Sequence, residues 1–241
     1  MYIGIDLGTS GVKTVLTNEA GAVVQSISRP LSVSMPQPLW SEQDPSDWWQ
    51  AACDCLDELS SKNNLSSVKA IGLSGQMHGA TLLDSEGSVL RPAILWNDGR
   101  SSEECEELAR LVPDSSIRTG NLIMAGFTAP KILWVKKNEP EIFSKIDKIL
   151  LPKDFLRYQL TGKFGSDMSD AAGTVWLNTE SRSWDEVLLK ACDLSVNNMP
   201  MLYEGSDVSG KLKETLQARW GMQDVVIAGG AGDNAAGAIG C

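Results

Sequence analysis

The hydrophobic pattern at the start of the chain predicts a three-stranded antiparallel meander. An apolar run over 2–5 ends at Asp6, a Gly-Thr-Ser-Gly turn follows, and a second apolar run covers 12–16. Glycine accepts backbone angles that other residues resist, so such a turn joins two antiparallel strands tightly. A further turn over 18–21 leads into a third predicted strand over 22–28. The chain is therefore expected to begin as antiparallel sheet.

A helix and a buried strand are predicted after the meander. Asp44 precedes Pro45, and an N-cap followed by proline at the first helical position is a typical helix start. Behind it, apolar residues recur at the spacing of one helix face: Trp48, Ala52, Cys55, Leu56 and Leu59. Residues 68–73 are the predicted strand. A meander, a crossover helix and a further strand together indicate a ribonuclease-H-like unit.

Short strands and helices alternate through the rest of the predicted structure. The expected strands are the two arms of a hairpin, 81–84 and 89–94, and single strands over 149–151 and 224–228. The expected helices begin at a capping box over 101–104, near Pro130, at Pro152 and at a cap over 183–186. Two of them should turn apolar residues inward: Cys105, Leu108, Ala109 and Val112 in the first, and Trp184, Leu188, Ala191 and Cys192 in the last. The whole pattern predicts an α/β fold.

Charge and composition exclude several classes of partner. The 241 residues include 21 basic and 31 acidic ones, a net charge of −10 with no basic run, which argues against nucleic acid or an anionic membrane surface. No apolar run approaches the length of a membrane span and nothing resembles a signal peptide, so a cytoplasmic protein is expected. The five cysteines lack paired CxxC spacing and are expected to be buried thiols, neither metal ligands nor disulfides: Cys53, Cys55, Cys105, Cys192 and Cys241.

The first turn, over 8–11, is a candidate phosphate site. Its backbone N–H groups, with the hydroxyls of Thr9 and Ser10, can converge on one point and form a nest for an anion. Asp6 at the end of the preceding strand suits a hydrated Mg²⁺, and Lys13 adds a cation beyond the turn. An ordinary surface hairpin is the alternative. No Gly-Lys-Ser/Thr follows, so this is not a Walker loop.

Two later loops are candidates for binding a sugar. The segment 74–80 leaves a strand end with Met77 and His78, the only histidine, between two glycines. Ligands bind in loops at such strand ends, although a structural histidine is the alternative. Trp96 offers an apolar plate for the C–H face of a sugar, unless it is a core tryptophan beside a turn. Three neighbours offer hydrogen bonds to hydroxyl groups: Asn97, Asp98 and Arg100.

Carboxylates mark two further segments. Residues 165–173 are small and acidic, and Asp167 and Asp170 are expected in a solvated turn, with hydroxyl recognition as the alternative. Near the end, the turn 229–232 places Asp233 at the head of an Ala/Gly-rich helix, where helix N–H groups favour a carboxylate anion. Aspartate also caps helices without other function, but a cap needs no preceding Gly-Gly-Ala-Gly. We therefore favour a functional role for Asp233.

From first residue to last, the chain resembles the FGGY family of carbohydrate kinases. Five motifs carry the resemblance: Asp-Leu-Gly-Thr-Ser-Gly-Val-Lys at 6–13, Gln-Met-His-Gly at 76–79, Trp-Asn-Asp-Gly-Arg at 96–100, Gly-Phe-Thr-Ala-Pro-Lys-Ile-Leu-Trp at 126–134, and Gly-Asp-Asn-Ala-Ala-Gly at 232–237. The resemblance implies two ribonuclease-H-like domains of the actin-like ATPase fold, each with a mixed sheet, facing across a cleft. Residues 1–241 correspond to the N-terminal domain, which holds the sugar and the catalytic base.

The resemblance also implies roles for individual residues. Asp233 is the implied catalytic base, and Asp6 is the implied catalytic carboxylate at the phosphates and at Mg²⁺, which it binds through water. The residues implied to contact the sugar are Met77, His78, Trp96 and Asn234. Those implied to contact the phosphates of ATP are Thr9, Ser10 and Lys13. The implied reaction is ATP-dependent phosphorylation of D-xylulose to D-xylulose 5-phosphate. Mg²⁺ and ATP are the implied cofactors, and a homodimer is left open.

Length is the one departure from the family pattern. Two domains of ordinary size need roughly twice this length, so the resemblance implies that a C-terminal ATP-binding domain is missing from this sequence. A fragment without that domain is expected to turn over no sugar alone. Two other functions stay open: a kinase for another polyol such as ribulose, gluconate or glycerol, and a sugar-binding remnant without catalysis.

Overall fold

The computed structural model describes residues 1–240, and its largest sheet begins with the predicted meander. The three strands pair antiparallel in chain order: β1 (Tyr2–Leu7), β2 (Gly11–Thr17) and β3 (Val23–Pro30). Along β1 the odd positions Ile3, Ile5 and Leu7 are buried, whereas Tyr2, Gly4 and Asp6 are exposed. One face of the sheet therefore meets the core, and Asp6 lies on the other.

Parallel strands extend this sheet on the other side of β1. β5 (Ala70–Gly75) lies parallel to β1, β14 (Val226–Ala228) and β15 (Ala231–Gly232) lie parallel to β5, and β13 (Val208–Lys211) is antiparallel to β14. The seven-stranded sheet has the order β13-β14-β5-β1-β2-β3, with β15 also on β5. A meander joined through a crossover helix to parallel strands is the mixed α/β arrangement that the sequence predicts.

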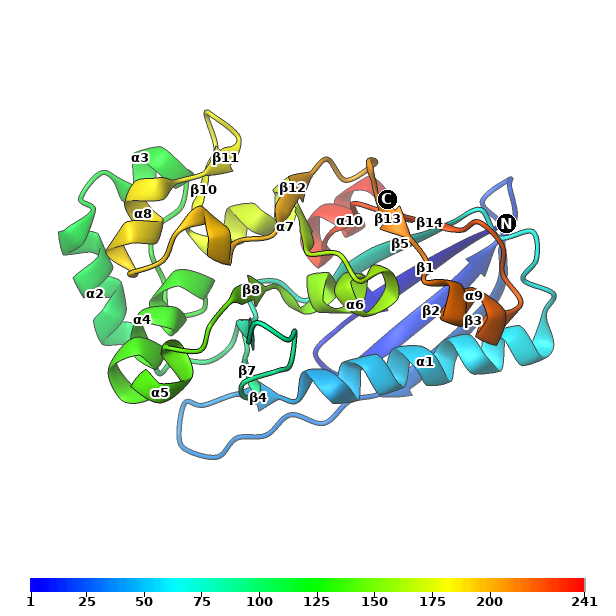
Figure 1. Ribbon diagram of the computed structural model, residues 1–241, viewed down its shortest axis with the longest axis horizontal. Helices are drawn as coiled ribbons and strands as arrows, with labels where there is room; N and C mark the ends of the chain where they lie inside the picture. The colour runs from blue at the N-terminus through cyan, green and yellow to red at the C-terminus, as the bar shows by residue number, and fades with distance from the viewer. Residues whose placement is uncertain (241) are drawn as a thin grey trace.

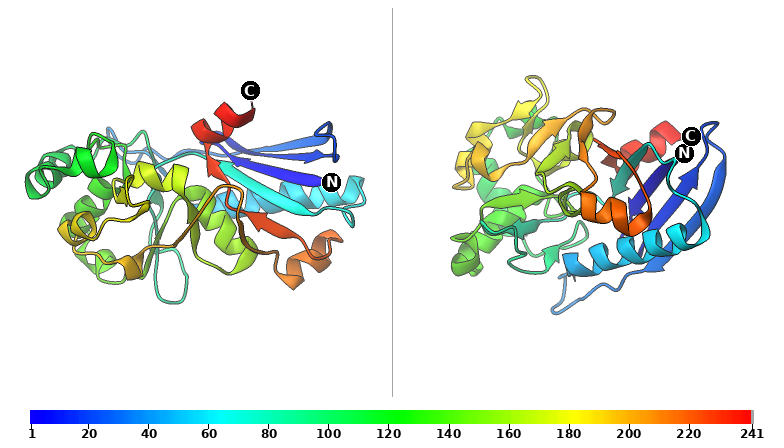
Figure 2. Two further views of the ribbon diagram at one scale, coloured as in Figure 1. Left: turned by 90° about the horizontal axis from the view of Figure 1, so that it is seen from above. Right: turned by 45° about the vertical axis from the view of Figure 1, so that its right-hand side comes forward.

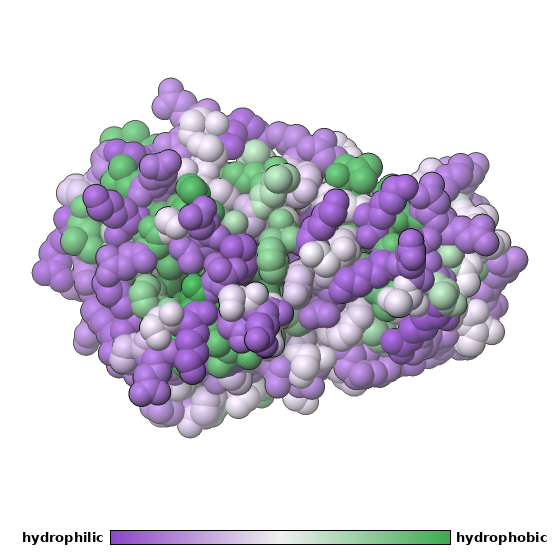
Figure 3. Space-filling model, in the orientation of Figure 1, coloured by the Kyte–Doolittle hydropathy of each residue, from purple (hydrophilic) through white to green (hydrophobic). Residues whose placement is uncertain are grey.

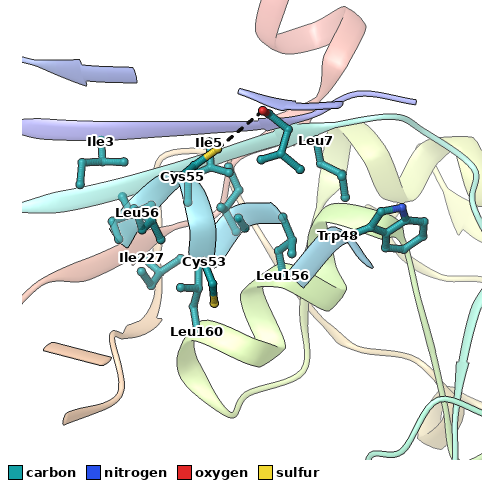
Figure 4. Packing of buried hydrophobic residues seen from close by; sticks show 14 of the residues in the cluster. Ile3, Ile5, Leu7, Trp48, Cys53, Cys55, Leu56, Leu156, Leu160 and Ile227 are labelled. Carbon is teal, nitrogen blue, oxygen red and sulfur yellow. Dashed lines mark hydrogen bonds between the residues drawn. The ribbon is translucent and has the colours of Figure 1, made fainter. Parts of the chain in front are cut away.

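Three helices cover the buried face of the sheet: α1 (Pro45–Lys62), α6 (Pro152–Thr161) and α9 (Glu214–Trp220) (Figure 1). Asp44 caps α1 as predicted, because its carboxylate accepts a hydrogen bond from the Ser46 amide at 2.9 Å. All five residues of the predicted apolar face are buried, and Figure 4 shows Trp48, Cys55 and Leu56 among residues of β1 and α6. The crossover helix is thus held by hydrophobic burial along one face.

A second hydrophobic core lies beside the sheet, in a mainly helical lobe at the left of Figure 1. Its helices are α2 (Ser102–Leu111), α3 (Ser115–Thr119), α4 (Thr128–Asn138), α5 (Pro140–Phe143) and α8 (Glu186–Ala191). Four two-strand pairs lie outside the large sheet: β4 (Glu42–Gln43) with β7 (Ala93–Ile94), β6 (Thr81–Leu83) with β8 (Lys148–Leu150), β9 (Gly165–Asp167) with β12 (Met201–Tyr203), and β10 (Leu177–Asn178) with β11 (Ser183–Trp184).

The remaining helical segments are short: α7 (Met168–Ala171), α10 (Asp233–Gly240) and the 3₁₀ turns Ala172–Thr174 and Val196–Asn198. α10 leaves the sheet on the side opposite α1 and α9 (Figure 2). Hydrophobic surface is seen mainly over the helical lobe in Figure 3. Ile117 in α3 of this lobe is 84% exposed. Within residues 1–240, no helix combines the length and the apolar character that crossing a bilayer requires.

The predicted hairpin over 81–94 forms only in part. The turn forms, because the Asp84 amide donates to Ser88 O at 3.0 Å, but the second arm meets the first only through isolated bridges from Val89 to Leu83 and from Ile94 to Ala80. β6 pairs instead with β8. Pro92 supplies the reason, since proline has no N–H to donate to a strand ladder.

The two other helices with predicted caps begin at the expected segments, but neither predicted serine caps its helix. The Ser101 hydroxyl donates to Ala125 O at 3.2 Å and caps nothing, and Ala109 is exposed, whereas Glu104 is buried and pairs with Lys137. α8 is capped by Asp185, two residues beyond the start of the predicted cap, through bonds from two backbone amides. Capping residues that compete along a polar stretch are chosen by the packing behind them.

The prediction of buried cysteines is confirmed for three of the four that the structure describes. Cys53, Cys55 and Cys192 are buried, Cys105 is half-buried, and all four are free thiols. Cys241 lies outside the described residues.

We predict that Leu56→Ala lowers the free energy of unfolding by about 2–5 kcal/mol, because Leu56 is fully buried between α1 and the sheet and alanine leaves a cavity. Ser61→Ala, on the exposed side of the same helix, should change it by less than about 0.5 kcal/mol. Urea denaturation followed by circular dichroism measures both. Equal effects would contradict the packing of α1.

Candidate functional site

The parallel register of the sheet brings the two predicted catalytic carboxylates to one edge. Asp6 on β1 is level with Ser74 on β5, and Ser74 is level with Ala231 on β15, two residues before Asp233. Neighbouring strands are about 4.8 Å apart, so residues on the two outer strands of this row are close in space. This edge points to the middle of the molecule, where α10 begins (Figure 1). The first and last motifs of the sequence therefore meet there.

Asp6 and Lys13 lie opposite each other on β1 and β2, on the exposed face. The Ser74 hydroxyl donates to the Asp6 carboxylate at 2.5 Å, which orients that side chain. Within residues 1–240, no group of three or more His, Cys, Asp or Glu side chains is placed to hold a metal ion. Asp6 alone fits the looser role of one carboxylate beside a hydrated Mg²⁺.

The turn between β1 and β2 presents backbone donors, as predicted. The Gly8 amide donates to Gly11 O at 3.0 Å and closes the turn. For the part of the chain that the structure describes, the amides of Thr9 and Ser10 have no acceptor. Gly11 allows a close approach to β3, since a Cβ there would lie 2.5 Å from Arg29 O. The two free amides and the exposed Ser10 hydroxyl can meet an anion.

The Thr9 hydroxyl has other partners in this structure. It donates its single proton to Gln76 Oε1 at 3.0 Å and accepts a hydrogen bond from Trp96 Nε1, also at 3.0 Å. Trp96 is 49% exposed, so one face of its ring is available beside the turn. The structure thus joins one predicted sugar residue directly to one predicted phosphate residue.

Two buried glutamines that sequence reasoning missed support this turn. Gln43 Nε2 donates to Thr9 O at 2.7 Å, and Gln76 Nε2 donates to Gln43 Oε1 at 2.9 Å. Trp48 Nε1 on α1 donates to the same Gln43 oxygen at 3.0 Å. A satisfied buried network of this kind fixes its members in place. Gln76 precedes Met77 in the sequence, and this position beside a predicted sugar residue was the one sign that could have pointed to it.

His78 has a backbone conformation that non-glycine residues seldom adopt. Its φ is 64°, and the Gly79 amide donates to Met77 O at 2.8 Å. A hydrogen bond from residue i+2 to residue i around a positive φ is a γ-turn, which is rare and strained. Strain of this kind persists only where the surroundings impose it, and it concentrates at functional sites.

The chemistry of the His78 ring follows from its neighbours. Nδ1 is 2.8 Å from Gly173 O, and a carbonyl only accepts, so Nδ1 carries the proton. Burial is the main reason that the pKa of His78 is lowered to about 4. The neutral ring therefore leaves Nε2 with a lone pair that can accept a hydrogen bond from a hydroxyl. Gly173 permits this, because a Cβ there would lie 2.3 Å from the ring.

Met77 connects this loop to the head of α10. Asn234 Nδ2 lies 3.8 Å from Met77 Sδ, and a Cβ on Gly232 would lie 3.0 Å from Met77 Cγ. Asp233 itself is exposed, and its Oδ1 accepts a hydrogen bond from the Asn234 amide at 2.7 Å. Met77 thus meets Asn234 beside Asp233, with His78 next to Met77 in the same loop, while Trp96 contacts Thr9 in the 8–11 turn.

Two of the predicted hydroxyl partners near Trp96 are wrong. Asp98 is buried and accepts hydrogen bonds from the Ser41 amide at 2.6 Å and from Arg100. The Arg100 guanidinium lies 3.7 Å from the ring centre of Trp40 and 4.9 Å from that of Trp134. Both charges are used within the fold, and only Asn97 of the three is exposed. Sequence spacing gave no sign of the tryptophan pair.

The prediction of a solvated turn at Asp167 and Asp170 is also wrong. Both are buried, where Lys153 Nζ lies 2.7 Å from Asp167 and 3.0 Å from Asp170. Asp154 lies 2.8 Å from the same ammonium, and Arg157 completes the cluster. Three carboxylates face two cations, so the cluster has one negative charge in excess when all groups are ionised.

This charge cluster lies behind the loop that carries Asp233. Arg157 donates to Ala228 O at 3.0 Å and also to Gly229 O, at the start of the glycine-rich turn. A Cβ on Gly232 would lie 3.3 Å from Asp170 Oδ1. The turn therefore rests on a buried ionic layer, and glycine lets its backbone approach closely.

Comparison with known proteins identifies the family. A family model described as the N-terminal domain of the FGGY family of carbohydrate kinases matches residues 1–240. The chain belongs to the FGGY family of carbohydrate kinases. A xylulose kinase of Escherichia coli K12 is 60% identical over 240 residues, which are 100% of this FGGY chain and 50% of that kinase.

Solved structures agree with this assignment. A crystal structure described as a xyloylose kinase from Brucella ovis matches with a TM-score of 0.94 and 51% identity, over 97% of this FGGY chain and 49% of the other. A glycerol kinase of Plasmodium falciparum with ADP matches with a TM-score of 0.88 and 26% identity, over 97% and 49%. The predicted actin-like α/β fold is confirmed, and the chain spans about half the length of the curated relatives that it matches.

We predict that His78 titrates near pH 4 in the folded chain, because burial disfavours its charged form. In 8 M urea the same residue should titrate near pH 6.5. As the only histidine, it gives one imidazole signal, which proton NMR follows against pH once any affinity tag is removed. A folded-state midpoint near 6.5 would contradict the buried, singly protonated ring.

We predict that Asp170→Asn gains stability relative to the parent chain as the pH rises from 5 to 8. Burial, with Asp154 and Asp167 nearby, raises the pKa of Asp170 to about 7, against about 3.9 when unfolded. Asp170 therefore stays protonated in the folded chain at pH values where it is ionised in the unfolded chain. Its contribution to the free energy of unfolding is fully present below about pH 4 and is lost as the pH rises through 7. The free energy of unfolding of the parent therefore falls by up to about 1.4 kcal/mol per pH unit, a loss that the Asp170→Asn variant does not share.

Urea denaturation at several pH values measures this difference, with the exposed Asp47→Asn as the matched control. A constant difference between Asp170→Asn and the parent would show that Asp170 is ionised throughout that range.

Proposed function

We propose that residues 1–241 form the N-terminal, sugar-binding domain of a kinase that transfers the γ-phosphoryl group of ATP to D-xylulose and yields D-xylulose 5-phosphate. The observation that carries this proposal is the exposed carboxylate of Asp233, which lies at the sheet edge with Met77 and Asn234 on one side and the 8–11 turn beyond Asp6. A sugar hydroxyl held there would lie between a proton acceptor and a phosphate site. The relatives named xylulose kinases support D-xylulose as the sugar.

The proposed roles follow from the chemistry of each group. Asp233 accepts the proton of the primary hydroxyl of the sugar as the hydroxyl oxygen attacks the γ-phosphorus of ATP, the bond to the β,γ-bridging oxygen breaks and ADP leaves. A carboxylate is a weak base for an alcohol, but phosphoryl transfer passes through a loose transition state in which orientation outweighs basicity. His78 Nε2 accepts a hydrogen bond from another hydroxyl, and the exposed face of Trp96 packs against the sugar C–H groups.

ATP and its metal belong at the turn between β1 and β2. The amides of Thr9 and Ser10, with Lys13, supply positive groups for phosphate oxygens, which the net charge of −10 makes necessary. Asp6 would hold Mg²⁺ through water, and the ion would neutralise charge on the phosphates. The adenosine site belongs to the second half of the kinase, so this chain alone should not turn over sugar. We place the reaction in cytoplasmic xylose metabolism and leave a homodimer as an assembly to be tested.

A kinase for another polyol is the second candidate. The match to a glycerol kinase with a TM-score of 0.88 favours it, because the same fold then serves a different substrate. A sugar-binding protein without catalysis is the remaining alternative. A protein of that kind would need no exposed carboxylate at position 233, so the presence of Asp233 favours a kinase.

We predict that the chain, fused to the C-terminal half of the Escherichia coli relative, phosphorylates D-xylulose with a higher kcat/KM than D-ribulose or glycerol. Asp233→Asn should lower kcat by about 10²–10⁴, the usual contribution of a positioned general base. Asp47→Asn, exposed on α1, is the matched control and should leave kcat unchanged. A coupled ADP-release assay measures all of these rates.

Each outcome separates the candidates. Preference for another sugar would replace D-xylulose as substrate, and full activity of Asp233→Asn would remove Asp233 from the chemistry. Sugar binding without phosphorylation by the fused chain would favour the non-catalytic protein. Turnover by the 241-residue chain alone would contradict its assignment as half of a kinase.

A further inference from the structure

Lys131 on α4 is a fully buried lysine without a counter-ion. Its exposed fraction is 0%, and no carboxylate among residues 1–240 pairs with it. Burying an amine or ammonium group without an acidic partner destabilises a protein, and an apolar residue of similar length would fill the same space. A lysine buried in this way needs specific hydrogen-bond acceptors for its amine group.

Its partners are two backbone carbonyl groups. Lys131 Nζ donates to His78 O at 2.9 Å and to Gly126 O at 2.8 Å. The Thr128 hydroxyl, one turn earlier on α4, donates to the same His78 oxygen at 3.1 Å. Two side chains of one rigid helix thus hold the carbonyl of the residue whose φ is 64°. These bonds are a physical reason why the strained γ-turn persists.

The second carbonyl belongs to the other side of the proposed sugar site. Gly126 lies directly against the backbone of Trp96, because a Cβ at position 126 would be 2.5 Å from Trp96 O. Lys131 therefore joins the loop of His78 to the segment that supports Trp96. The ring of Phe127, next to Gly126, also packs edge-on against His78, with ring centres 4.5 Å apart.

We propose that Lys131 is a positioning residue that fixes the direction of the His78 ring and the spacing between His78 and Trp96. It touches no substrate and acts through the two carbonyls. This inference rests on the proposed function, since those two residues form the sugar site there.

Both charge states of Lys131 can fulfil this role. Burial, with a contribution from the nearby Arg100 against that of Asp98, lowers the pKa of Lys131 to about 7. An ammonium has three N–H groups and a neutral amine has two, and the two carbonyls need only two. The positioning should therefore be the same on either side of neutral pH.

The single histidine makes a direct test feasible. Long-range ¹⁵N–¹H NMR on the tag-free chain distinguishes a protonated Nδ1 from a protonated Nε2. The parent should show the Nδ1–H form alone, because Gly173 O accepts that proton. Lys131→Met should release the loop and give averaged nitrogen shifts from both tautomers. It should also weaken D-xylulose binding at least tenfold in calorimetry.

Lys136→Met is the matched control, because Lys136 lies on the same helix, is partly exposed and pairs with Asp193. It should leave both the tautomer and the affinity unchanged. If Lys131→Met keeps the Nδ1–H form and the parent affinity while only its unfolding midpoint moves, Lys131 is merely structural and the proposal is overturned.

A second variant covers the case in which Lys131→Met does not fold. Thr128→Val removes the other donor to His78 O at nearly constant volume and should shift the nitrogen signals in the same direction, by less. An unchanged tautomer in that variant would overturn the proposal. If the parent chain binds no sugar, the proposed function is in question, whereas the tautomer comparison still decides the role of Lys131.

Discussion

The parallel pairing of β1, β5 and β15 is the constraint on which the rest of the site depends. Its register puts Asp6, Ser74 and Ala231 in one row, although the first and last are separated by most of the chain. Carboxyl ends of parallel strands share one edge of a sheet, so every loop that follows them opens on the same side. The hairpin turn, the His78 loop and the head of α10 meet because of this register.

Buried polar side chains then fix each of these loops. Gln43 and Gln76 hold the hairpin turn, Lys131 holds the His78 loop, and the cluster around Lys153 lies behind the turn that precedes Asp233. Polar groups cost free energy when they are buried, unless their hydrogen bonds are satisfied. In each network the hydrogen bonds are made to a backbone carbonyl or a turn, so the exposed groups of the loops are held in defined positions.

Glycine has a matching role at this edge, because backbone and side chains approach too closely there for a Cβ. Gly173 admits the His78 ring, Gly126 lies against Trp96, and Gly232 lies between Met77 and Asp170. The exposed carboxylate of Asp233 therefore lies above tightly packed backbone and side chains. Such packing limits the movement of the loop that carries Asp233.

Features that depend on local pattern were predictable from the sequence. Apolar runs separated by turn residues predicted the meander, the Asp44-Pro45 start and apolar face predicted α1, and the five motifs indicated the family. Tertiary structure decided what burial and long-range contacts control. Asp167 and Asp170 look solvated in sequence but pair with Lys153, and Pro92 with the competing strand β8 left the predicted hairpin incomplete. The local sequence around a charged or turn residue is the same whether water or a distant side chain binds its polar group. The fold alone decides which partner is present.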